Sequence, residues 1–534
     1  METMNGAVLR AMLESAANHL NNNKKYVDSL NVFPVPDGDT GTNMSLTFSN
    51  GINEVKKSGS ESLPVIAKTL SRGTLMGARG NSGVILSQIF RGFNQAVAGK
   101  ETLNAAEFSE ALSNGSKLAY KAVMRPVEGT ILTVIRESTE AAAKYLEENP
   151  ESSIEEFVNV LCDAAKTSLD GTPELLPVLK EAQVVDSGGA GLLKVFEGFK
   201  AYLEGKPVSA GEEETAVAET KSEKASGYRT EYILRLNEHG QRSFKEERIR
   251  HSLEQLGNKL TLLVEGNTVK VRVNTMTPGE ILTLAQRYGE FVKVQIENIQ
   301  DDLKPSIIEE EKPAEEKEYG MIAVAAGEGL KRLFTDYRVD IVVSGGQTMN
   351  PSTEDFVTAI SKIPARHIYL LPNNSNIIMA AKQAADVTSD KDIIVLETRS
   401  VPEGLSACVA FNPDDAPEDN TSAMQEAVSN VRSGSVTYAI KDTTVDGREI
   451  HAGDYMGIKG KDIICTSKNQ YDVLKQLLDS MVDEDTEIVT ILRGEGSTDE
   501  EAEAIGQYID DNFDFDVDIE DGGQPVYSYM IGVE

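Results

Sequence analysis

Apolar residues recur with a helical period through roughly the first two hundred residues of the chain. Near the N-terminus Val8, Met12, Ala16 and Leu20 repeat every four positions, which predicts an amphipathic helix. Further helices of this kind are predicted near Asn43, after Gly83, over Ile131–Tyr145 and after Gly191. Few stretches in this part alternate with period two, so we predict that it is all-α.

Residues 227–300 combine apolar patterns of the helical period with patterns of the strand period of two. Strand patterns occupy Tyr232–Leu236, Leu262–Val264 and Val269–Val273, and helical patterns occupy Ile249–Leu256 and Gly279–Tyr288. The run EGNTVKV predicts a hairpin turn between the second and third of these strands. This part is therefore predicted to be a small α+β domain.

Residues 319–534 alternate short apolar runs, most of them rich in β-branched residues, with helical patterns. The runs are Ile322–Ala326, Ile341–Ser344, Ile368–Leu371 and Ile393–Leu396. Such alternation predicts βαβ units around a parallel sheet, and hence a C-terminal α/β domain. Later segments at Val436–Ile440, Asp462–Cys465 and Ile488–Leu492 are expected to extend this domain within the α/β or α+β class.

Two stretches have the composition of linkers. Residues 207–226 are small, polar and charged, so they cannot bury a core. Residues 301–318 are rich in Glu, Lys and Pro. The 534-residue chain is thus predicted to form three domains, at 1–206, 227–300 and 319–534, with sizes that suit separate cores.

The formal net charge of −34 narrows the classes of partner. Nucleic acids and anionic membranes need clustered Lys and Arg, so we expect neither to bind the chain as a whole. No apolar run reaches the roughly 20 residues of a membrane span, and the N-terminal segment lacks the pattern of a signal peptide. Cys162, Cys408 and Cys465 form no disulfide framework, so we expect free thiols in the reducing cytoplasm.

An acidic run is the strongest candidate for chemistry. From Asn31 the chain reads NVFPVPDGDTGTNMS, with Asp37 and Asp39 on either side of a glycine. Two carboxylates on one tight loop repel each other unless a hard cation such as Mg²⁺ binds, and that ion prefers oxygen ligands together with phosphate. The predicted helix that follows presents its N-terminus, which suits a phosphate group. An acidic turn that only caps a helix would explain the spacing equally well.

A glycine-rich run precedes a strongly apolar helix. Residues 73–83 read GTLMGARGNSG. Backbone N–H groups in such a run can approach phosphate oxygens, and Arg79 could neutralise charge on a transferring phosphoryl group. The run matches neither the P-loop nor the Rossmann fingerprint. Close packing of helices through glycine is the structural alternative.

Two shorter segments, Pro126–Thr130 and Val185–Gly191, are glycine-containing turns before helices. Read alone, each is more often a turn with a helix cap than a ligand site.

Taken together, these motifs resemble one family. The runs DGDTGTNM, GARGNSG, the EGT turn and DSGGAG follow the order found in the nucleotide-binding domain of dihydroxyacetone kinases of the L-subunit type. The whole chain looks closer still to the catalytic subunit of bacterial fatty acid kinase, in which a small middle domain and a C-terminal α/β domain follow. The runs Ser344–Pro351 and Leu371–Asn376 are similar to that family's C-terminal domain.

The resemblance implies a multidomain protein whose N-terminal helical barrel binds ATP at one end with two Mg²⁺ ions. By motif, Asp37 and Asp39 would be metal ligands and, with Arg79, catalytic residues; Asn31 would be a further metal ligand. The cofactor-binding positions carried over by motif are Thr40, Gly41, Asn43, Met44, Ser45, Gly77, Ala78, Gly80, Asn81, Ser82, Gly83, Thr130, Asp186, Gly188 and Gly189. Of these, the last four would lie near the ribose and adenine.

The resemblance also implies an activity. In fatty acid kinase the substrate arrives on a DegV-type fatty-acid-binding protein, and its carboxylate attacks the γ-phosphorus to give acyl phosphate for phospholipid synthesis. A carboxylate is already ionised at pH 7, so no general base is required. The family further implies a homodimer through the middle domain, and we expect the C-terminal domain to dock the binding protein.

Two other functions stay open. A dihydroxyacetone-type kinase for a small hydroxylated substrate would share the N-terminal motifs, although no histidine is placed to hold a ketone and the extra domains are unlike that enzyme. A non-catalytic nucleotide-binding scaffold would carry a degraded site, whereas the Asp-Gly-Asp loop and the glycine-rich loop are intact.

The middle domain departs from the family at a zinc site, and this difference predicts that the protein contains no structural zinc. Some members carry a Cys and two His there, whereas this chain has Arg229, Arg272 and Asn274 in the corresponding runs. Zinc sites use Cys, His or carboxylate ligands, so we predict no structural zinc. Elemental analysis of the purified protein measures this directly, and one tightly held zinc per chain would refute it.

Overall fold

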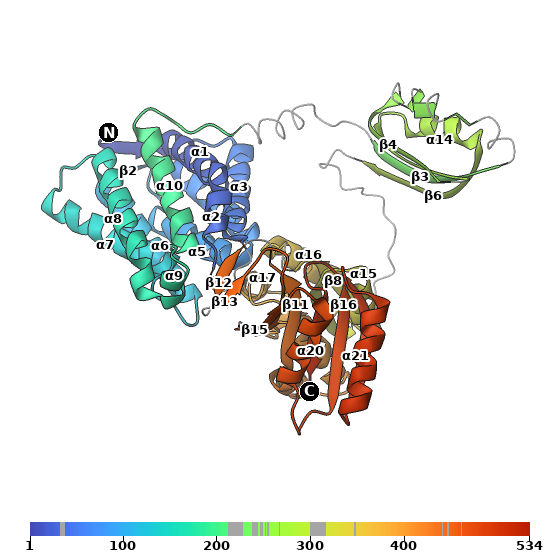
Figure 1. Ribbon diagram of the computed structural model, residues 1–534. Helices are drawn as coiled ribbons and strands as arrows, with labels where there is room; N and C mark the ends of the chain where they lie inside the picture. The colour runs from blue at the N-terminus through green and yellow to red at the C-terminus, as the bar shows by residue number, and fades with distance from the viewer. Residues whose placement is uncertain are drawn as a thin grey trace. The chain divides into compact units, whose positions relative to one another are not determined.

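The computed structural model describes residues 1–32, 38–211, 228–237, 244–245, 249–250, 252–253, 256–265, 267–298, 317–346, 349–439, 442–445, 448–460 and 462–534. The chain forms two compact units, one of Met1–Ala210 with Pro313–Glu534 and one of Gly211–Lys312. Figure 1 shows the helical N-terminal part in blue to green and the C-terminal part in yellow to red. Residues 212–226 of the first predicted linker and 301–316 of the second lie outside the described residues.

The N-terminal part of the first unit is a bundle of helices, as predicted. Its helices are α1 (Gly6–Asn22), α2 (Lys24–Ser29), α3 (Thr40–Ser58), α4 (Leu63–Met76), α5 (Gly80–Ala96), α6 (Ala105–Ala122), α7 (Ile131–Glu148), α8 (Ile154–Leu175), α9 (Pro177–Glu181) and α10 (Ser187–Leu203). The prediction of an all-α part missed one short ribbon, in which β1 (Thr3–Asn5) pairs with β2 (Thr102–Asn104).

The long helices close into a ring. From α3 to α8 each long helix packs on the next, α8 packs on α10, and α10 packs on α1, which contacts α3. Short connections make neighbouring helices antiparallel. The N-termini of α3, α5, α7 and α10 therefore lie at the same end of the bundle. That end carries the loops that contain the candidate residues predicted from the sequence.

Aromatic side chains and small residues fill the interior of the bundle. Phe48 of α3 stacks on Phe90 of α5 with ring centroids 4.9 Å apart, and Phe108 meets Phe157 at 5.4 Å. Helices α1 and α10 approach closely at Gly198, which has no side chain. A Cβ atom there would lie only 2.4 Å from the Cα atom of Ala16. The bundle thus depends on shape at this contact as well as on apolar area.

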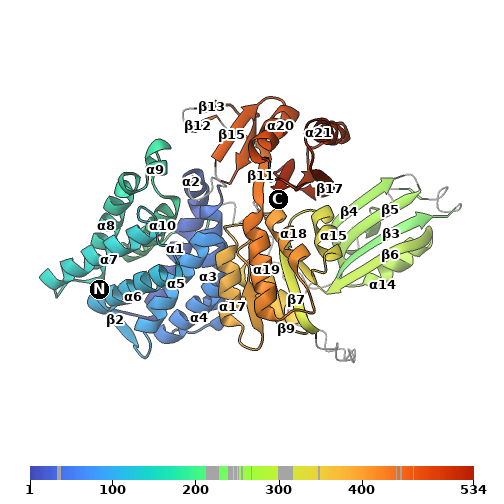
Figure 2. The ribbon, with the colours of Figure 1, turned by 90° about the horizontal axis from the view of Figure 1, so that it is seen from below.

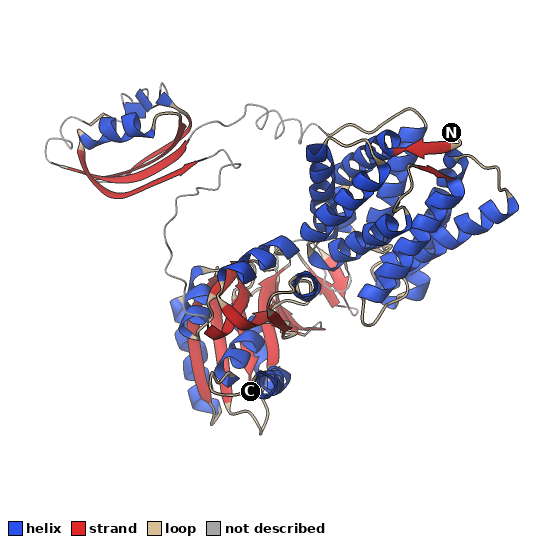
Figure 3. Cartoon of the chain, turned by 180° about the vertical axis from the view of Figure 1, so that it is seen from behind, coloured by secondary structure: helices blue, strands red, loops and turns tan. Residues whose placement is uncertain are grey.

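The C-terminal part begins with the predicted parallel sheet, whose strands appear red in Figure 3. Its strands are β7 (Lys317–Ala325), β8 (Ile341–Ser344), β9 (Ala365–Leu371) and β10 (Asp392–Val395), in the order β10-β9-β7-β8. The helices after these strands are α15 (Glu328–Asp336), α16 (Thr353–Lys362), α17 (Ile378–Val387), α18 (Val401–Ala410) and α19 (Pro417–Asn430). The α/β class predicted for this domain is confirmed.

The later strands form a second sheet instead of extending the first. They are β11 (Arg432–Tyr438), β14 (Tyr455–Lys459), β15 (Asp462–Ser467), β16 (Ile488–Gly494), β17 (Asp516–Gln524) and β18 (Tyr529–Val533), in the order β15-β14-β11-β18-β16-β17. Only β16 and β17 are parallel among these pairs. A parallel crossover needs about a dozen residues, and β14 and β15 are only two residues apart. The other elements here are the ribbon β12 (Thr443–Val445) and β13 (Arg448–Ile450), α20 (Gln470–Met481) and α21 (Asp499–Asn512).

The middle unit is a four-stranded antiparallel sheet with helix α14 (Pro278–Gln286). Its strands are β3 (Tyr228–Leu236), β4 (Asn258–Glu265), β5 (Thr268–Thr275) and β6 (Gly289–Asn298), in the order β4-β5-β3-β6. The predicted hairpin is confirmed, because Glu265 pairs with Thr268. Strand β6 was not predicted, although Val292, Val294 and Ile296 alternate in it.

In the described part of the chain, no helix combines the length and the apolar character that crossing a bilayer requires. All three cysteines are buried, and none of them forms a disulfide bond in the described structure. Burial raises the pKa of the Cys162 thiol to about 12, and does the same for Cys408. These thiols therefore act as small apolar side chains.

The Gly198 contact gives a stability prediction. In Gly198→Ala the new methyl group must push α10 away from Ala16, so the free energy of unfolding should fall by about 1–3 kcal/mol. Gly171→Ala is the matched control, because it is also a helical glycine but nothing lies within 4 Å of a Cβ atom there. That variant should gain about 0.5–1 kcal/mol. Urea unfolding followed by helical circular dichroism distinguishes the two, and an equal effect at both sites would contradict the close-contact argument.

Candidate active site

Asp39 stands at the N-terminus of α3, but its own side chain does not cap that helix. A residue of α2 takes that role instead. Asp28 accepts hydrogen bonds from the backbone N–H of Thr42 at 2.9 Å and from the Thr42 hydroxyl at 2.8 Å. The carboxylate of Asp39 is thereby spared for other partners. Asp28, which lies fourteen positions from Thr42, was not predicted as part of the site.

The glycine-rich loop brings the N-terminus of α5 against α3. Gly80 has φ +59°, and a Cβ atom on it would lie 2.6 Å from Nδ2 of Asn43. A Cβ atom on Gly83 would lie 2.4 Å from the hydroxyl of Thr47, which accepts a hydrogen bond from the backbone N–H of Arg79 at 3.2 Å. The two candidate runs are therefore packed together, and Thr47 is a further residue that was not predicted from the sequence.

The N-termini of α3 and α5 lie next to each other, and neither is capped by its own N-cap residue. This pair is the main electrostatic feature of this end of the bundle. The N-cap residues Asp39 of α3 and Arg79 of α5 make no side-chain capping bond. The first N–H groups of a helix lack intrahelical partners and carry partial positive charge, which favours an anion. The amide oxygen Oδ1 of Asn81 is buried and has no hydrogen-bond partner within the described residues. The helix ends thus suit phosphate oxygens, whereas the unpaired Asn81 oxygen suits a cation or a hydrogen-bond donor.

The N-termini of α7 and α10 differ, because their own residues cap them. The Thr130 hydroxyl accepts from the N–H of Leu132 at 3.4 Å, and Asp186 Oδ2 accepts from the N–H of Gly189 at 2.7 Å. A Cβ atom on Gly188 would contact Ile131 of α7 at 3.1 Å. The turn-and-cap alternative therefore describes the geometry of both motifs.

A polar cluster fixes the turn before α7. Glu128 accepts hydrogen bonds from the Thr133 hydroxyl at 2.6 Å, from Arg136 at 2.9 Å and from the Tyr120 hydroxyl at 3.1 Å. The Thr133 hydroxyl, followed by Arg136 and Tyr120, holds the pKa of Glu128 below its ordinary value. The cluster engages both oxygens of this carboxylate in the structure.

The structure disperses several of the predicted nucleotide residues along α3. Thr40, Gly41 and Asn43 are buried in its first turn, and Asn43 faces Gly80. Met44 lies in the apolar core, where a Cβ atom on Gly191 would approach its sulfur to 2.6 Å. The Ser45 hydroxyl donates to Asn21 at 3.0 Å, toward α1. Asn43 thus contacts the glycine-rich loop, whereas Gly41 packs against Lys24 and Val27 of α2.

Of the remaining predicted residues, Gly77 and Ser82 belong to that loop, and Asn31 follows α2. A Cβ atom on Gly77 would meet the side chain of Asn50 at 2.5 Å, and Ser82 is half-buried in α5. Asn31 is buried after α2, and its backbone N–H donates to the carbonyl oxygen of Asp28 at 3.1 Å. Asp37 lies outside the described residues.

The C-terminal domain also reaches this end of the bundle. Nδ2 of Asn350 donates to Oδ2 of Asp39 at 2.5 Å, and Arg79 donates to the Asn350 carbonyl oxygen at 2.6 Å. Arg79 lies 3.6 Å from Asp355 as well. Figure 2 shows α17, which contacts α5, at the border with the bundle. The run that contains Asn350 was singled out in the sequence, but its domain was expected to dock a partner.

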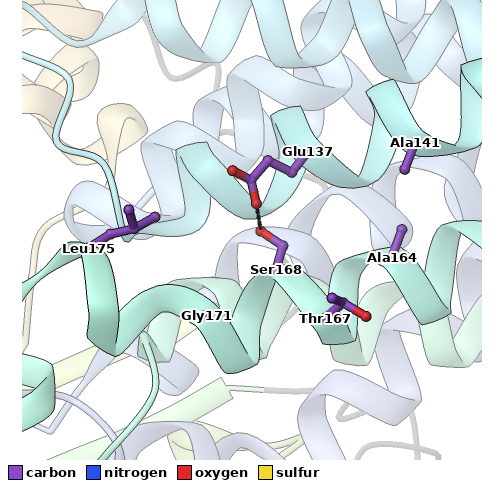
Figure 4. Close-up of a pocket in the computed structure, with 7 residues that line it drawn as sticks. All are labelled: Glu137, Ala141, Ala164, Thr167, Ser168, Gly171 and Leu175. Atoms are coloured by element: carbon purple, nitrogen blue, oxygen red, sulfur yellow. Dashed lines mark hydrogen bonds between the residues drawn. The ribbon is translucent and has the colours of Figure 1, made fainter.

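A separate cavity of about 290 Å³ lies between α7 and α8. Figure 4 shows the residues that line it, which are Glu137, Ala141, Ala164, Thr167, Ser168, Gly171 and Leu175. Across it the Ser168 hydroxyl donates to Glu137 at 2.7 Å. It shares no residue with the loops around Asp39 and Arg79.

The donor set fits magnesium-nucleotide in part. A carboxylate and backbone N–H groups are the ligands that Mg²⁺ and phosphate oxygens prefer, and Arg79 adds a positive charge. Within the described residues no group of three or more His, Cys, Asp or Glu side chains could hold a metal ion by itself. Phosphate oxygens and water normally complete a magnesium shell, so one or two carboxylates suffice.

Three sequence families match successive parts of the chain. Residues 34–201 match the DAK2 domain, residues 225–305 match the middle domain of FakA-like fatty acid kinase proteins, and residues 320–534 match the C-terminal domain of the same FakA-like proteins. "Protein YloV" from Bacillus subtilis (strain 168) is 44% identical over 100% of both chains. The chain belongs to the FakA-like fatty acid kinase family. An uncharacterized protein from Staphylococcus haemolyticus (strain JCSC1435) is 40% identical over 99% of both chains.

Two solved structures are more distant. A DegV family protein from Corynebacterium glutamicum has a TM-score of 0.32 at 13% identity, covering 40% of this chain and 96% of its own. The dihydroxyacetone kinase of C. freundii has a TM-score of 0.28 at 18% identity, covering 37% of this chain and 34% of its own. The resemblance inferred from the motifs is confirmed by the family matches, which give this FakA-like chain the domains of a kinase family.

The buried Asp186 gives a pH-dependent prediction for this family member. Burial raises the pKa of its carboxyl group from 3.8 to about 6, although hydrogen bonds from the N–H groups of Gly189 and Ile131 oppose the shift. The native state then takes up a proton at higher pH than the unfolded state. The contribution of this group to the free energy of unfolding therefore falls as pH rises from about 4 to about 6.

Asp186→Asn keeps a capping oxygen but cannot titrate. The stability of this variant relative to the wild type should rise by about 1–3 kcal/mol between pH 4 and pH 6.5. Urea unfolding of both proteins over that range measures the difference. A difference that stays constant with pH would show that Asp186 is ionised normally in the folded state.

Proposed function

We propose that this chain is the ATP-dependent component of a fatty acid kinase. It would transfer the γ-phosphoryl group of ATP to the carboxylate of a fatty acid held by a DegV-type binding protein. The acyl phosphate formed would feed phospholipid synthesis. The observation that carries the proposal is that Asp39 and Arg79, the N-cap residues of α3 and α5, contact the same residue, Asn350, in a member of the FakA-like fatty acid kinase family.

The chain's own residues have distinct tasks in this proposal. Asp39, together with the predicted ligands Asp37 and Asn31, would hold the two predicted magnesium ions. The backbone N–H groups of the loop at Gly80–Gly83 would bind phosphate oxygens, and Arg79 would offset charge on the transferred group. The bound metal would supply charge neutralisation during phosphoryl transfer.

The reaction needs alignment more than acid–base chemistry. A carboxylate oxygen forms the new O–P bond while the bond from phosphorus to the β,γ-bridging oxygen breaks, and ADP leaves with that electron pair. No proton is removed from an ionised carboxylate, so no histidine base is required. Consistently, His19 is engaged elsewhere, 3.0 Å from Glu197.

The middle unit has a feature that supports the proposed homodimer. Its strand β6 lies at the edge of the sheet, and Val292, Val294 and Ile296 are exposed on it. An exposed apolar edge strand can pair with a second chain, and natural proteins rarely leave one uncovered. We infer that a second copy of this chain covers β6.

Turnover assays with single omissions test the proposed function. ATP consumption is expected only when Mg²⁺, a fatty acid and a DegV-type binding protein are all present with the wild-type chain. Turnover with dihydroxyacetone and no binding protein would instead show a small-molecule kinase, an alternative that the DAK2 domain leaves room for. No turnover with intact nucleotide binding would contradict the fatty acid as acceptor and leave the phosphoryl acceptor unknown.

Asp39→Ala should lower kcat/KM about 100-fold or more, the scale on which an electrostatic stabiliser acts. The matched control is Asp170→Ala, which removes an exposed carboxylate of α8 that pairs with Lys166 at 3.1 Å. Its turnover should equal that of the wild type. Equal activity in both variants would exclude Asp39 from the reaction.

A further inference from the structure

We propose that Asn350 of the C-terminal domain is a positioning residue for the kinase site, because it fixes the side chains of Asp39 and Arg79 at once. This inference rests on the proposed function. It gives the C-terminal domain a part in holding magnesium-nucleotide, in addition to any docking of a partner.

Asn350 contacts both groups through different atoms. Its side-chain amide donates to Oδ2 of Asp39 at 2.5 Å, while its backbone carbonyl oxygen accepts from the guanidinium of Arg79 at 2.6 Å. The residue is 2% exposed, so water competes little for these bonds. A carboxylate turns easily about its terminal torsion, and an anchored donor selects one orientation. Asn350 thus orients a negative and a positive group beside each other.

The chain around Asn350 holds it firmly. It follows β8 at the carboxyl edge of the parallel sheet, where α/β domains commonly place ligand-binding loops. Before it, Gly346 and Met349 exchange backbone hydrogen bonds at 3.1 and 3.3 Å. After it, Ser352 and Asp355 form a capping box at the start of α16. Asn350 therefore lies between two locally fixed segments.

The same face of the C-terminal domain is packed against the glycine-rich loop. The backbone N–H of Thr353 donates to the carbonyl oxygen of Ala78 at 3.2 Å. Ala78 and Val84 belong to the same buried apolar cluster as Phe356 of α16. The contact that carries Asn350 is thus a filled interface, in which a displaced side chain is not readily replaced by water.

The amide oxygen of Asn350 gives a second, independent observation. Oδ1 is buried and has no hydrogen-bond partner anywhere in the described structure. Leaving a buried acceptor unpaired costs free energy. A cation or a hydrated phosphate beside Asp39 would supply the missing partner.

Magnesium-dependent nucleotide binding by the full-length chain tests the proposal. The measurement is the Mg²⁺ concentration that gives half-maximal binding of a fluorescent ADP analogue. Asn350→Ala should raise this concentration about 10- to 100-fold, as removal of an outer-shell partner of a metal ligand does.

The control is Gln383→Ala, in which the residue lost is also buried in the interface. Gln383 donates to the carbonyl oxygen of Leu75 at 2.7 Å and accepts from Gln88 at 2.9 Å, and neither bond involves Asp39 or Arg79. Its magnesium midpoint should equal that of the wild type. An unchanged midpoint in Asn350→Ala would overturn the proposal. A lower midpoint would also overturn it, because Asn350 would then compete with the nucleotide.

Asn350→Asp covers the case in which Asn350→Ala fails to fold. This variant keeps the size of the side chain but sets a second carboxylate against Asp39. Its Tm without metal should lie below that of the wild type, and Mg²⁺ with ADP should raise it by more than they raise the Tm of Gln383→Ala. Equal shifts in the two variants would overturn the proposal.

These outcomes separate the two claims. ADP binding involves no acyl acceptor, so a wild-type chain that binds magnesium-nucleotide but phosphorylates no fatty acid refutes only the proposed function. A wild-type chain with full turnover and an unaffected Asn350→Ala variant refute only the role of Asn350. A wild-type chain that binds no magnesium-nucleotide refutes both.

Discussion

The close approach of α3 and α5 at Gly80 and Gly83 is the constraint on which the site depends. Any side chain at either position would collide with Asn43 or Thr47 and separate the two helices. Their approach places two positive helix ends side by side, each worth roughly half an elementary charge. The two positive helix ends repel each other, so a negatively charged group between them is stabilising. This local positive charge occurs in a chain whose net charge is −34. The carboxylates of Asp28 and Asp39 both lie at the N-terminus of α3 and offset part of this positive charge.

Much of the fold was predictable because local patterns set it. The helices predicted near Asn43, after Gly83, over Ile131–Tyr145 and after Gly191 are all present, and each begins within a few residues of the prediction. Strand Ile341–Ser344 has the predicted bounds. The second sheet of the C-terminal domain was missed, since apolar runs alone do not state whether the next strand is parallel. The short connection between β14 and β15 indicates that these two strands are antiparallel.

The motifs of the candidate site could be picked out in the sequence, but the residues that contact them could not. Glycine spacing and paired carboxylates pointed to Asp39 and Arg79. The residues that hold them do not share their segments: Asp28 acts across fourteen positions, and Asn350 is 311 positions from Asp39. Hydrogen bonds over such separations leave no periodicity in one sequence. The proposed role of Asn350 depends on the contact between the helical bundle and the C-terminal domain, which the sequence alone does not reveal.

The first unit is discontinuous in sequence, since Gly211–Lys312 separates its halves. The middle unit is therefore an insertion in the chain of the first unit. The contact between the helical bundle and the α/β domain closes the loop that this insertion forms. Closure entropy grows only logarithmically, by about 0.6 kcal/mol for each doubling of loop length. The insert can consequently lengthen, shorten or be exchanged at little thermodynamic cost. A change in the length of the insert should therefore leave the contacts around Asp39 in place.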